Sequence, residues 1–135
     1  MKSDAHLQKA ERITRQIAKI GARFHEARVE AAMLAATHWT NRSLHILGIL
    51  PEAHDMIHTD YLTGADHLRL KLVAPALLAA VEGIEDLRAP YVRGAAPDRV
   101  AAGETAIRLL ALVEVEARKV RAPELPFVTY SPHAT

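Results

Sequence analysis

Residues 22–47, ARFHEARVEAAMLAATHWTNRSLHIL, form the most apolar segment of the chain and predict one long α-helix. At about 1.5 Å per residue this helix is close to 40 Å long. Gly48 and Pro51 follow it, and both residue types are typical of the end of a helix. One seam of side chains at helical spacing is expected to face the neighbouring helices. The seam consists of Phe24, Ala27, Ala31, Leu34, Ala35, His38, Arg42 and His45.

Three further segments show helical periodicity, one before this helix and two after it. The first covers about Asp4–Ile20, and the side chain of Asp4 can cap its N-terminus. Thr63-Gly64-Ala65-Asp66 has the pattern of a capping box and begins a third segment, which reaches about Leu87. Pro75 lies inside this segment and predicts a break near Val73-Ala74, because a proline ring clashes with the preceding turn of a helix.

The last helix is expected over about Pro97–Val120, since proline suits the first turn of a helix. Together the segments predict an all-α, antiparallel up-and-down bundle of four or five helices in one domain, residues 1–121. Residues 122–135 are expected to form an extended or disordered tail, in which a short strand at 127–130 is conceivable only as a partner-docked segment. Five residues on apolar helix faces are predicted to lie in the core: Leu34, Leu77, Val81, Ile107 and Leu110.

The composition excludes several classes of function. The chain has 135 residues and no cysteine, so disulfides, thiolate metal sites and cysteine nucleophiles are excluded. Its formal net charge of +1 is not that of a strongly basic nucleic-acid-binding protein. No apolar run approaches the roughly 20 residues of a membrane span, and no secretory leader is recognisable. A cytoplasmic protein with no membrane partner is therefore expected.

Three polar side chains interrupt the apolar helix on one side. His38, Arg42 and His45 are spaced i, i+4 and i+7, so they project in similar directions. One interpretation is a ligand site that faces a groove of the bundle, with Asn41 nearby. The other is a set of partly buried histidines that hydrogen-bond to the backbone or to acids of neighbouring helices.

A second polar cluster, Arg88, Tyr91 and Arg93, precedes Gly94. Arginine forks bind phosphates and tyrosine stacks on bases, so this cluster can bind a nucleotide-like ligand. Alternatively it is an ordinary solvated helix end, where cations interact favourably with the helix dipole. Any ligand pocket is predicted to combine this cluster with the polar side of the long helix, where histidines and arginines together suit an anion such as a phosphate.

The connection after the long helix contains His54 and His58, a spacing that lets two histidines share one metal ion when it lies on a helix. Zinc needs a third or fourth ligand, for which Asp60, His67 and His38 are candidates. The alternative is that these residues make capping and loop hydrogen bonds. A divalent metal is thus the one cofactor that the sequence allows for, and no other cofactor is expected.

The alanine-rich second helix, the connection with histidine and aspartate, and the segment Glu85-Asp86-Leu87-Arg88-Ala89-Pro90-Tyr91-Val92-Arg93-Gly94 resemble HEPN-type helical domains over about residues 4–121. The resemblance implies a compact bundle that forms a homodimer and that acts on RNA or pairs with a nucleotidyltransferase. Catalytic members carry an arginine followed four to six residues later by a histidine. No arginine here has such a histidine, and Arg42 and His45 are too close in the chain.

The sequence therefore favours a non-enzymatic HEPN-like bundle that dimerises and binds a partner protein or a nucleotide-like ligand, with a nucleotidyltransferase as one partner. The alternative is an enzyme, either an RNase that uses Arg42 and His45 or a metal-dependent bundle that uses His54 and His58. A purely structural protein whose tail docks on another chain is the third hypothesis.

Overall fold

The computed structural model describes residues 1–124 and shows an all-α protein, with no strand in that range. Five α-helices pack against each other, and two short helical turns lie between them. The α-helices are α1 (Ser3–Ile17), α2 (His25–Ile46), α3 (Gly64–Val73), α4 (Pro75–Arg88) and α5 (Arg99–Lys119); the short turns are η1 (Thr59–Tyr61), a 3₁₀-helix, and η2 (Ala89–Arg93), a π-helix.

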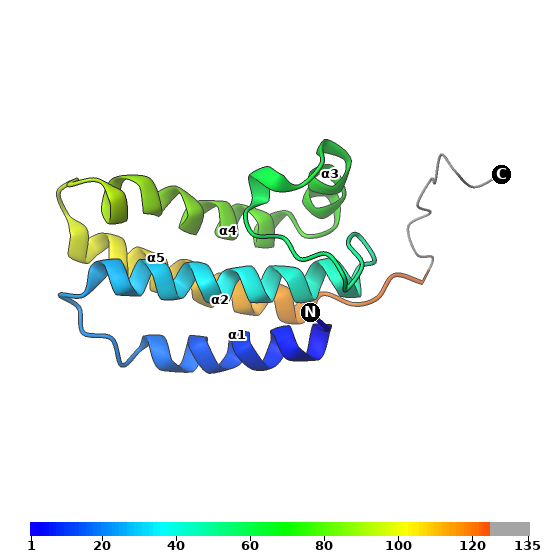
Figure 1. Cartoon of the computed structure of the whole chain (residues 1–135), viewed down its shortest axis with the longest axis horizontal. Coiled ribbons are helices and arrows are strands. Elements are labelled where there is room, and N and C mark those ends of the chain that lie inside the picture. The colour runs from blue at the N-terminus through cyan, green and yellow to red at the C-terminus, as the bar shows by residue number, and fades with distance from the viewer. Residues whose placement is uncertain (125–135) are drawn as a thin grey trace.

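Figure 1 shows α1, α2, α4 and α5 lying side by side along the long axis, each running opposite to the long helix before it. The central helix is α2, which packs against α1, α4 and α5. The short helix α3 lies at one end of the bundle beside the start of α4. At that end α1 begins and both α2 and α5 finish, so three helix termini lie near one another.

The central position of α2 explains why its buried side chains are spread around the helix. Val29, Ala36 and Trp39 are completely buried, and the Nε1–H group of Trp39 donates a hydrogen bond to Thr14 Oγ1 at 3.1 Å. The seam predicted from the sequence lies mostly on a different side of α2 from these three residues. Leu34 is 53% exposed, so its prediction as a core residue was wrong.

The other predicted core residues have different outcomes. Leu77, Val81 and Leu110 are buried, as predicted. Ile107 is only partly buried and packs against the edge of the core. The apolar faces of α4 and α5 were therefore predicted correctly in outline.

The predicted break near Val73-Ala74 is confirmed, because Ala74 separates α3 from α4 with φ −144° and ψ 61° and Pro75 is the first residue of α4. The predicted cap at Thr63 is also present, since the backbone N–H of Asp66 donates to Thr63 Oγ1 at 3.1 Å. Asp4 does not cap α1, which begins one residue before it.

The long helices are slightly shorter than predicted. Helix α1 ends at Ile17, and α5 begins at Arg99 because Asp98 adopts a left-handed conformation with φ 61°. The segment 127–130, for which a docked strand was considered, lies outside the described residues. In the described part of the chain, no helix is both long enough and apolar enough to cross a membrane.

Candidate metal centre

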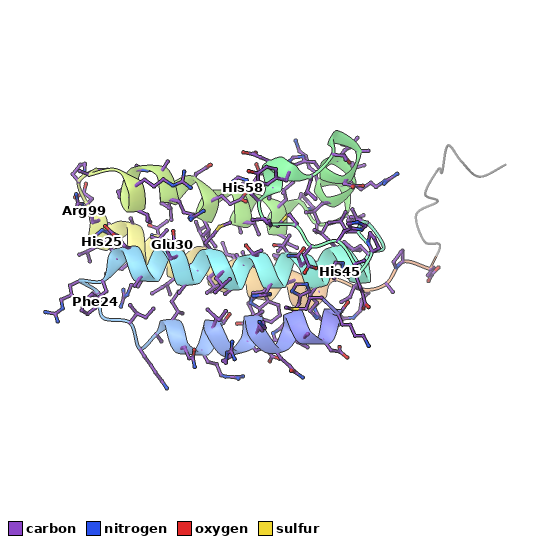
Figure 2. The ribbon with its side chains drawn as sticks, viewed as in Figure 1. Phe24, His25, Glu30, His45, His58 and Arg99 are labelled. Carbon is purple, nitrogen blue, oxygen red and sulfur yellow. The ribbon has the colours of Figure 1, made fainter. Side chains whose placement is uncertain are left out.

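Three potential metal ligands from three segments converge at the end of the bundle where α2 finishes. His6 comes from α1, His45 from the last turn of α2, and Asp55 from the connection that follows α2. The Nε2 atoms of His6 and His45 each lie 2.9 Å from Asp55 Oδ1. The two imidazoles are 2% and 1% exposed and the carboxylate is 34% exposed. Figure 2 shows His45 at this end of α2.

The backbone after α2 turns back and brings Asp55 to the histidines. Gly48 ends the helix with φ +71°, a conformation that glycine adopts without steric cost. The buried side chain of Asn41 then binds both backbone groups of Met56: its Nδ2 donates to the carbonyl at 2.8 Å, and its Oδ1 accepts from the N–H at 2.6 Å. Asn41 thereby fixes the residue directly after Asp55.

The outer ring nitrogens of both histidines also have partners. His45 Nδ1 lies 3.1 Å from the carbonyl oxygen of Leu50, and His6 Nδ1 lies 2.9 Å from His38 Nδ1. Because a carbonyl only accepts, the Nδ1 atom of His45 carries a proton. The Nε2 atom of His45 then either carries a second proton toward Asp55 or holds a cation in its place. Histidines that ligate metals commonly donate their other N–H to a backbone carbonyl in this way.

At two of the three ligands, His6 and Asp55, the electrostatics favour the protonation state that a metal needs. Burial lowers the pKa of His6 and, together with the nearby His6 ring, that of His38, so both favour the neutral imidazole. Burial alone would raise the pKa of Asp55, but hydrogen bonds from His6, His45 and the amino group of Met1 outweigh it and lower this pKa to about 2. Neutral imidazoles and an ionised carboxylate are the metal-binding forms of these side chains.

The spacing of the ligand atoms suits a first-row divalent ion. The nitrogen and oxygen atoms lie within 4.8 Å of one another. With bonds of about 2.0–2.1 Å, ligands at right angles around an ion are about 2.9 Å apart, and tetrahedral ligands about 3.3 Å apart. The observed 2.9 Å between each histidine Nε2 atom and Asp55 Oδ1 fits ligands at right angles. A small increase in these distances gives the tetrahedral spacing. Two imidazoles and one carboxylate are the donor set of catalytic zinc and non-haem iron sites.

A mostly apolar pocket adjoins the centre. Asp55 lines this pocket, together with His54 and the apolar residues Leu50, Met56 and Ile57. A metal ion at Asp55 would therefore lie beside a space that a small organic group can enter.

The structure separates the two halves of the ligand pocket predicted from the sequence. His38 and His45 belong to the metal centre, whereas Arg88 pairs with Glu30, its Nε atom 2.7 Å from Oε1. Glu30 and His45 are 15 residues apart on α2 (45 − 30), or about 22 Å along the helix. Figure 2 shows them toward opposite ends of α2.

The remaining predicted ligand residues also lie elsewhere. Arg42 directs one N–H toward the carbonyl of Ala117 on α5, at 3.4 Å. Tyr91 and Arg93 belong to η2 after α4, and Arg93 lines a groove with Arg88 and His58. The predicted cluster of six is thus divided among three places.

His54 and His58 are not part of the three-ligand group found among the described residues. The stretch between them is not helical, so the i, i+4 spacing does not put both on one face. His58 instead makes the alternative contacts: its Nδ1 atom lies 3.1 Å from the Asp60 backbone nitrogen and 3.2 Å from Oε2 of the buried Glu85. Glu85 also accepts hydrogen bonds from the N–H and hydroxyl groups of Thr59.

Sequence reasoning did not identify His6 and Asp55 as ligands. They lie 39 residues before and 10 residues after His45 (45 − 6 and 55 − 45), and no motif links such distant positions. The one available signal was a histidine near the start of the first helix and another near the end of the second, which becomes meaningful only when these helices are known to be antiparallel neighbours.

Comparison with known proteins adds no relative: no protein-family model, no curated protein and no solved structure matches this chain. The assignment of the centre therefore depends on its own geometry.

Proposed function

We propose that this protein binds a divalent transition-metal ion through His6, His45 and Asp55. One observation carries the proposal: two buried imidazole Nε2 atoms point at the same carboxylate oxygen, each at 2.9 Å. The Leu50 carbonyl and His38 occupy the outer nitrogens of these imidazoles, as the orienting partners of metal ligands do.

Three protein ligands leave at least one coordination position free, which is typical of catalytic rather than structural zinc sites. The apolar pocket beside Asp55 adjoins this free coordination position and has a suitable size for a small ligand. The arrangement supports the metal-dependent bundle considered from the sequence, with ligands other than His54 and His58. In this proposal the ion holds a water molecule or a small substrate at the mouth of the pocket.

The test is metal binding by protein that has been freed of metal by dialysis against a chelating resin. We expect calorimetry with Zn²⁺ to give one ion per chain and Co²⁺ to produce a visible absorption spectrum. His45→Ala and Asp55→Asn should each weaken binding at least about tenfold. His58→Ala is a matched control outside both the ligand group and the pocket and should bind as wild type, with circular dichroism confirming that all three variants fold.

Two results would contradict the proposal. One is the absence of Zn²⁺ and Co²⁺ binding by the wild-type chain at micromolar concentration. The other is a loss of binding in His58→Ala with none in His45→Ala, which would return the metal to the pair predicted from the sequence.

The HEPN-like topology, the homodimer and a nucleotidyltransferase partner also remain proposals. Their support is the order of the long helices and the sequence resemblance. RNA cleavage by Arg42 and His45 has less support, because the His45 ring faces Asp55 while Arg42 faces the end of α5. Binding of a nucleotide-like ligand is favoured by the weak pairing of Arg42, which borders a surface depression with two further arginines.

A further inference from the structure

A second cluster lies at the same end of the bundle, on the side where α2 meets α5. Arg42 of α2, Arg118 in the last turn of α5 and Arg121 just after α5 border one surface depression. Its remaining lining is largely apolar, from Ile46, Val120 and Ala122. Three guanidinium groups therefore share a small part of the surface.

The contacts of these arginines leave much of their charge unpaired. Arg118 has acidic partners, since its guanidinium lies 2.8 Å from Glu114 and 3.1 Å from Glu11. Arg121 donates to the carbonyls of Arg118 and Val120, at 2.6 and 2.9 Å.

Arg42 has the weakest set of contacts, although it is half-buried. Among residues 1–124 its one side-chain hydrogen bond is the long contact of 3.4 Å with the Ala117 carbonyl, and it forms no ion pair within 4.0 Å. Burial lowers its pKa, the charges of Arg118 and Arg121 lower it further, and the carboxylates of Asp4 and Glu11 offset part of this. Folding has thus placed a partly desolvated cation beside two others, an arrangement that an anion would relieve.

We propose that Arg42, Arg118 and Arg121 bind the phosphate group of a small phosphorylated ligand. Guanidinium forks match the oxygen atoms of phosphate, and three forks on one depression can contact more oxygens than a carboxylate offers. Arg118 is paired with two glutamates, whereas Arg42 and Arg121 have no carboxylate within 4.0 Å among residues 1–124. This inference does not depend on the metal centre, which uses none of these residues.

The competing role for these arginines is to cap the carbonyl groups at the end of α5, where cations interact favourably with the helix dipole. The two roles differ in what Arg42 does. If Arg42 caps α5, it stabilises the fold whether or not an anion is present. If Arg42 binds the phosphate, its replacement weakens the affinity for the anion.

Calorimetry measures the binding of pyrophosphate and of AMP to the metal-free protein. Sodium chloride is added so that the two titrations have the same ionic strength. We expect saturable binding by wild type, at least tenfold weaker binding by Arg42→Gln, and intermediate binding by Arg42→Lys, which keeps the charge but loses the fork. Arg108→Gln, an exposed arginine on α5 that does not line the depression, is the matched control and should bind as wild type. A preference for AMP over pyrophosphate would identify the source as a nucleotide, and the reverse would identify a free phosphate compound.

Three outcomes would overturn the inference. One is the absence of binding of either probe by the wild type at millimolar concentration. Another is equal anion affinity in Arg42→Gln and the wild type. Finally, a lower melting temperature of Arg42→Gln without any change in anion affinity would assign the arginines to capping the end of α5.

Discussion

At the scale of single residues, the position of Asp55 in the proposed metal centre is fixed by a side chain that is not one of the three ligands. Asn41 forms two hydrogen bonds with the backbone of Met56, and so fixes the position of the neighbouring Asp55. Sequence inspection placed Asn41 near a candidate site, but it gave no reason to connect this residue with a loop 15 residues later (56 − 41). The connection arises because the chain reverses after Gly48.

Asn41→Ala should therefore have two effects. It leaves the N–H and carbonyl groups of Met56 without their partner, which we expect to lower the free energy of unfolding by roughly 2–4 kcal/mol. It should also weaken Zn²⁺ binding, because Asp55 is no longer held in place. Thr40→Ala is the control for denaturation and calorimetry: Thr40 is equally buried but bonds only within α2, so its loss should leave Zn²⁺ affinity unchanged. Equal Zn²⁺ affinity in Asn41→Ala and wild type would contradict this role.

The ionisable residues of the centre predict how the stability of the metal-free protein depends on pH. His6 and His38 have lowered pKa values, so the unfolded chain binds more protons below about pH 6.5 and stability falls as the pH falls. Asp55 acts in the same direction at lower pH: its stabilisation is complete above 3.8 and is lost toward about 2. The Asp55 shift amounts to no more than about 2 kcal/mol, and solvent screening at this partly exposed group reduces it.

Urea unfolding at a series of pH values measures this dependence. We expect the free energy of unfolding of the wild type to decline in two steps, and that of Asp55→Asn to lack the step between about pH 4 and pH 2. A wild-type protein that gains stability on acidification from pH 7 to pH 5 would show that the histidines are not buried as neutral groups.

At the scale of helices, local chemistry was predicted well and burial was predicted unevenly. The break at Pro75 and the cap at Thr63 depend on a few adjacent residues, so the sequence is sufficient to find them. Burial on α2 depends on how many neighbours the helix has. Because α2 packs against three helices, and much of its contact surface is alanine, its periodicity does not define a single buried side. Leu34 was therefore assigned to the core although it faces solvent.

Helix α5 separates its buried and exposed side chains more clearly, so a buried and an exposed leucine on it can be compared. Leu110 is 1% exposed and Leu112, two residues later, is 53% exposed. We expect Leu110→Ala to lower the free energy of unfolding by about 2–5 kcal/mol because it creates a cavity, and Leu112→Ala to change it by no more than about 0.5 kcal/mol. Chemical denaturation of the two variants measures this difference. Similar losses in both would mean that α5 presents a different face to the core.

At the scale of the whole molecule, the homodimer stays a prediction. The alanine-rich faces that suggested close approach between two chains are partly used within one chain, since Ala32, Ala35 and Ala36 are buried. The HEPN resemblance is then the main ground for the dimer. Light scattering at micromolar concentration should give twice the mass of one 14.8 kDa chain. A mass of one chain would contradict the prediction and would leave the proposed metal centre intact, since its three ligands come from one chain.

The metal centre also predicts a property of the whole fold. His6, His45 and Asp55 join the first helix, the central helix and the loop after it, and the unfolded chain does not hold these residues together. An ion that binds only the folded chain adds about 2.7 kcal/mol to its stability at a free concentration 100 times the Kd. For a domain of this size, that corresponds to a rise of roughly 10 °C in Tm.

Calorimetric melting with and without Zn²⁺ tests this linkage. We expect the Tm of wild type to rise with Zn²⁺ and to return to its starting value when a chelator is added. His58→Ala should behave as wild type, because its ring is outside the ligand group and the adjoining pocket, whereas Asp55→Asn should show little or no rise. The same rise in Asp55→Asn and wild type would mean that the ion stabilises the bundle from another site. A rise that is confined to chains with all three ligands would tie the metal ion to the packing of α1 against α2, and so to the stability of the bundle itself.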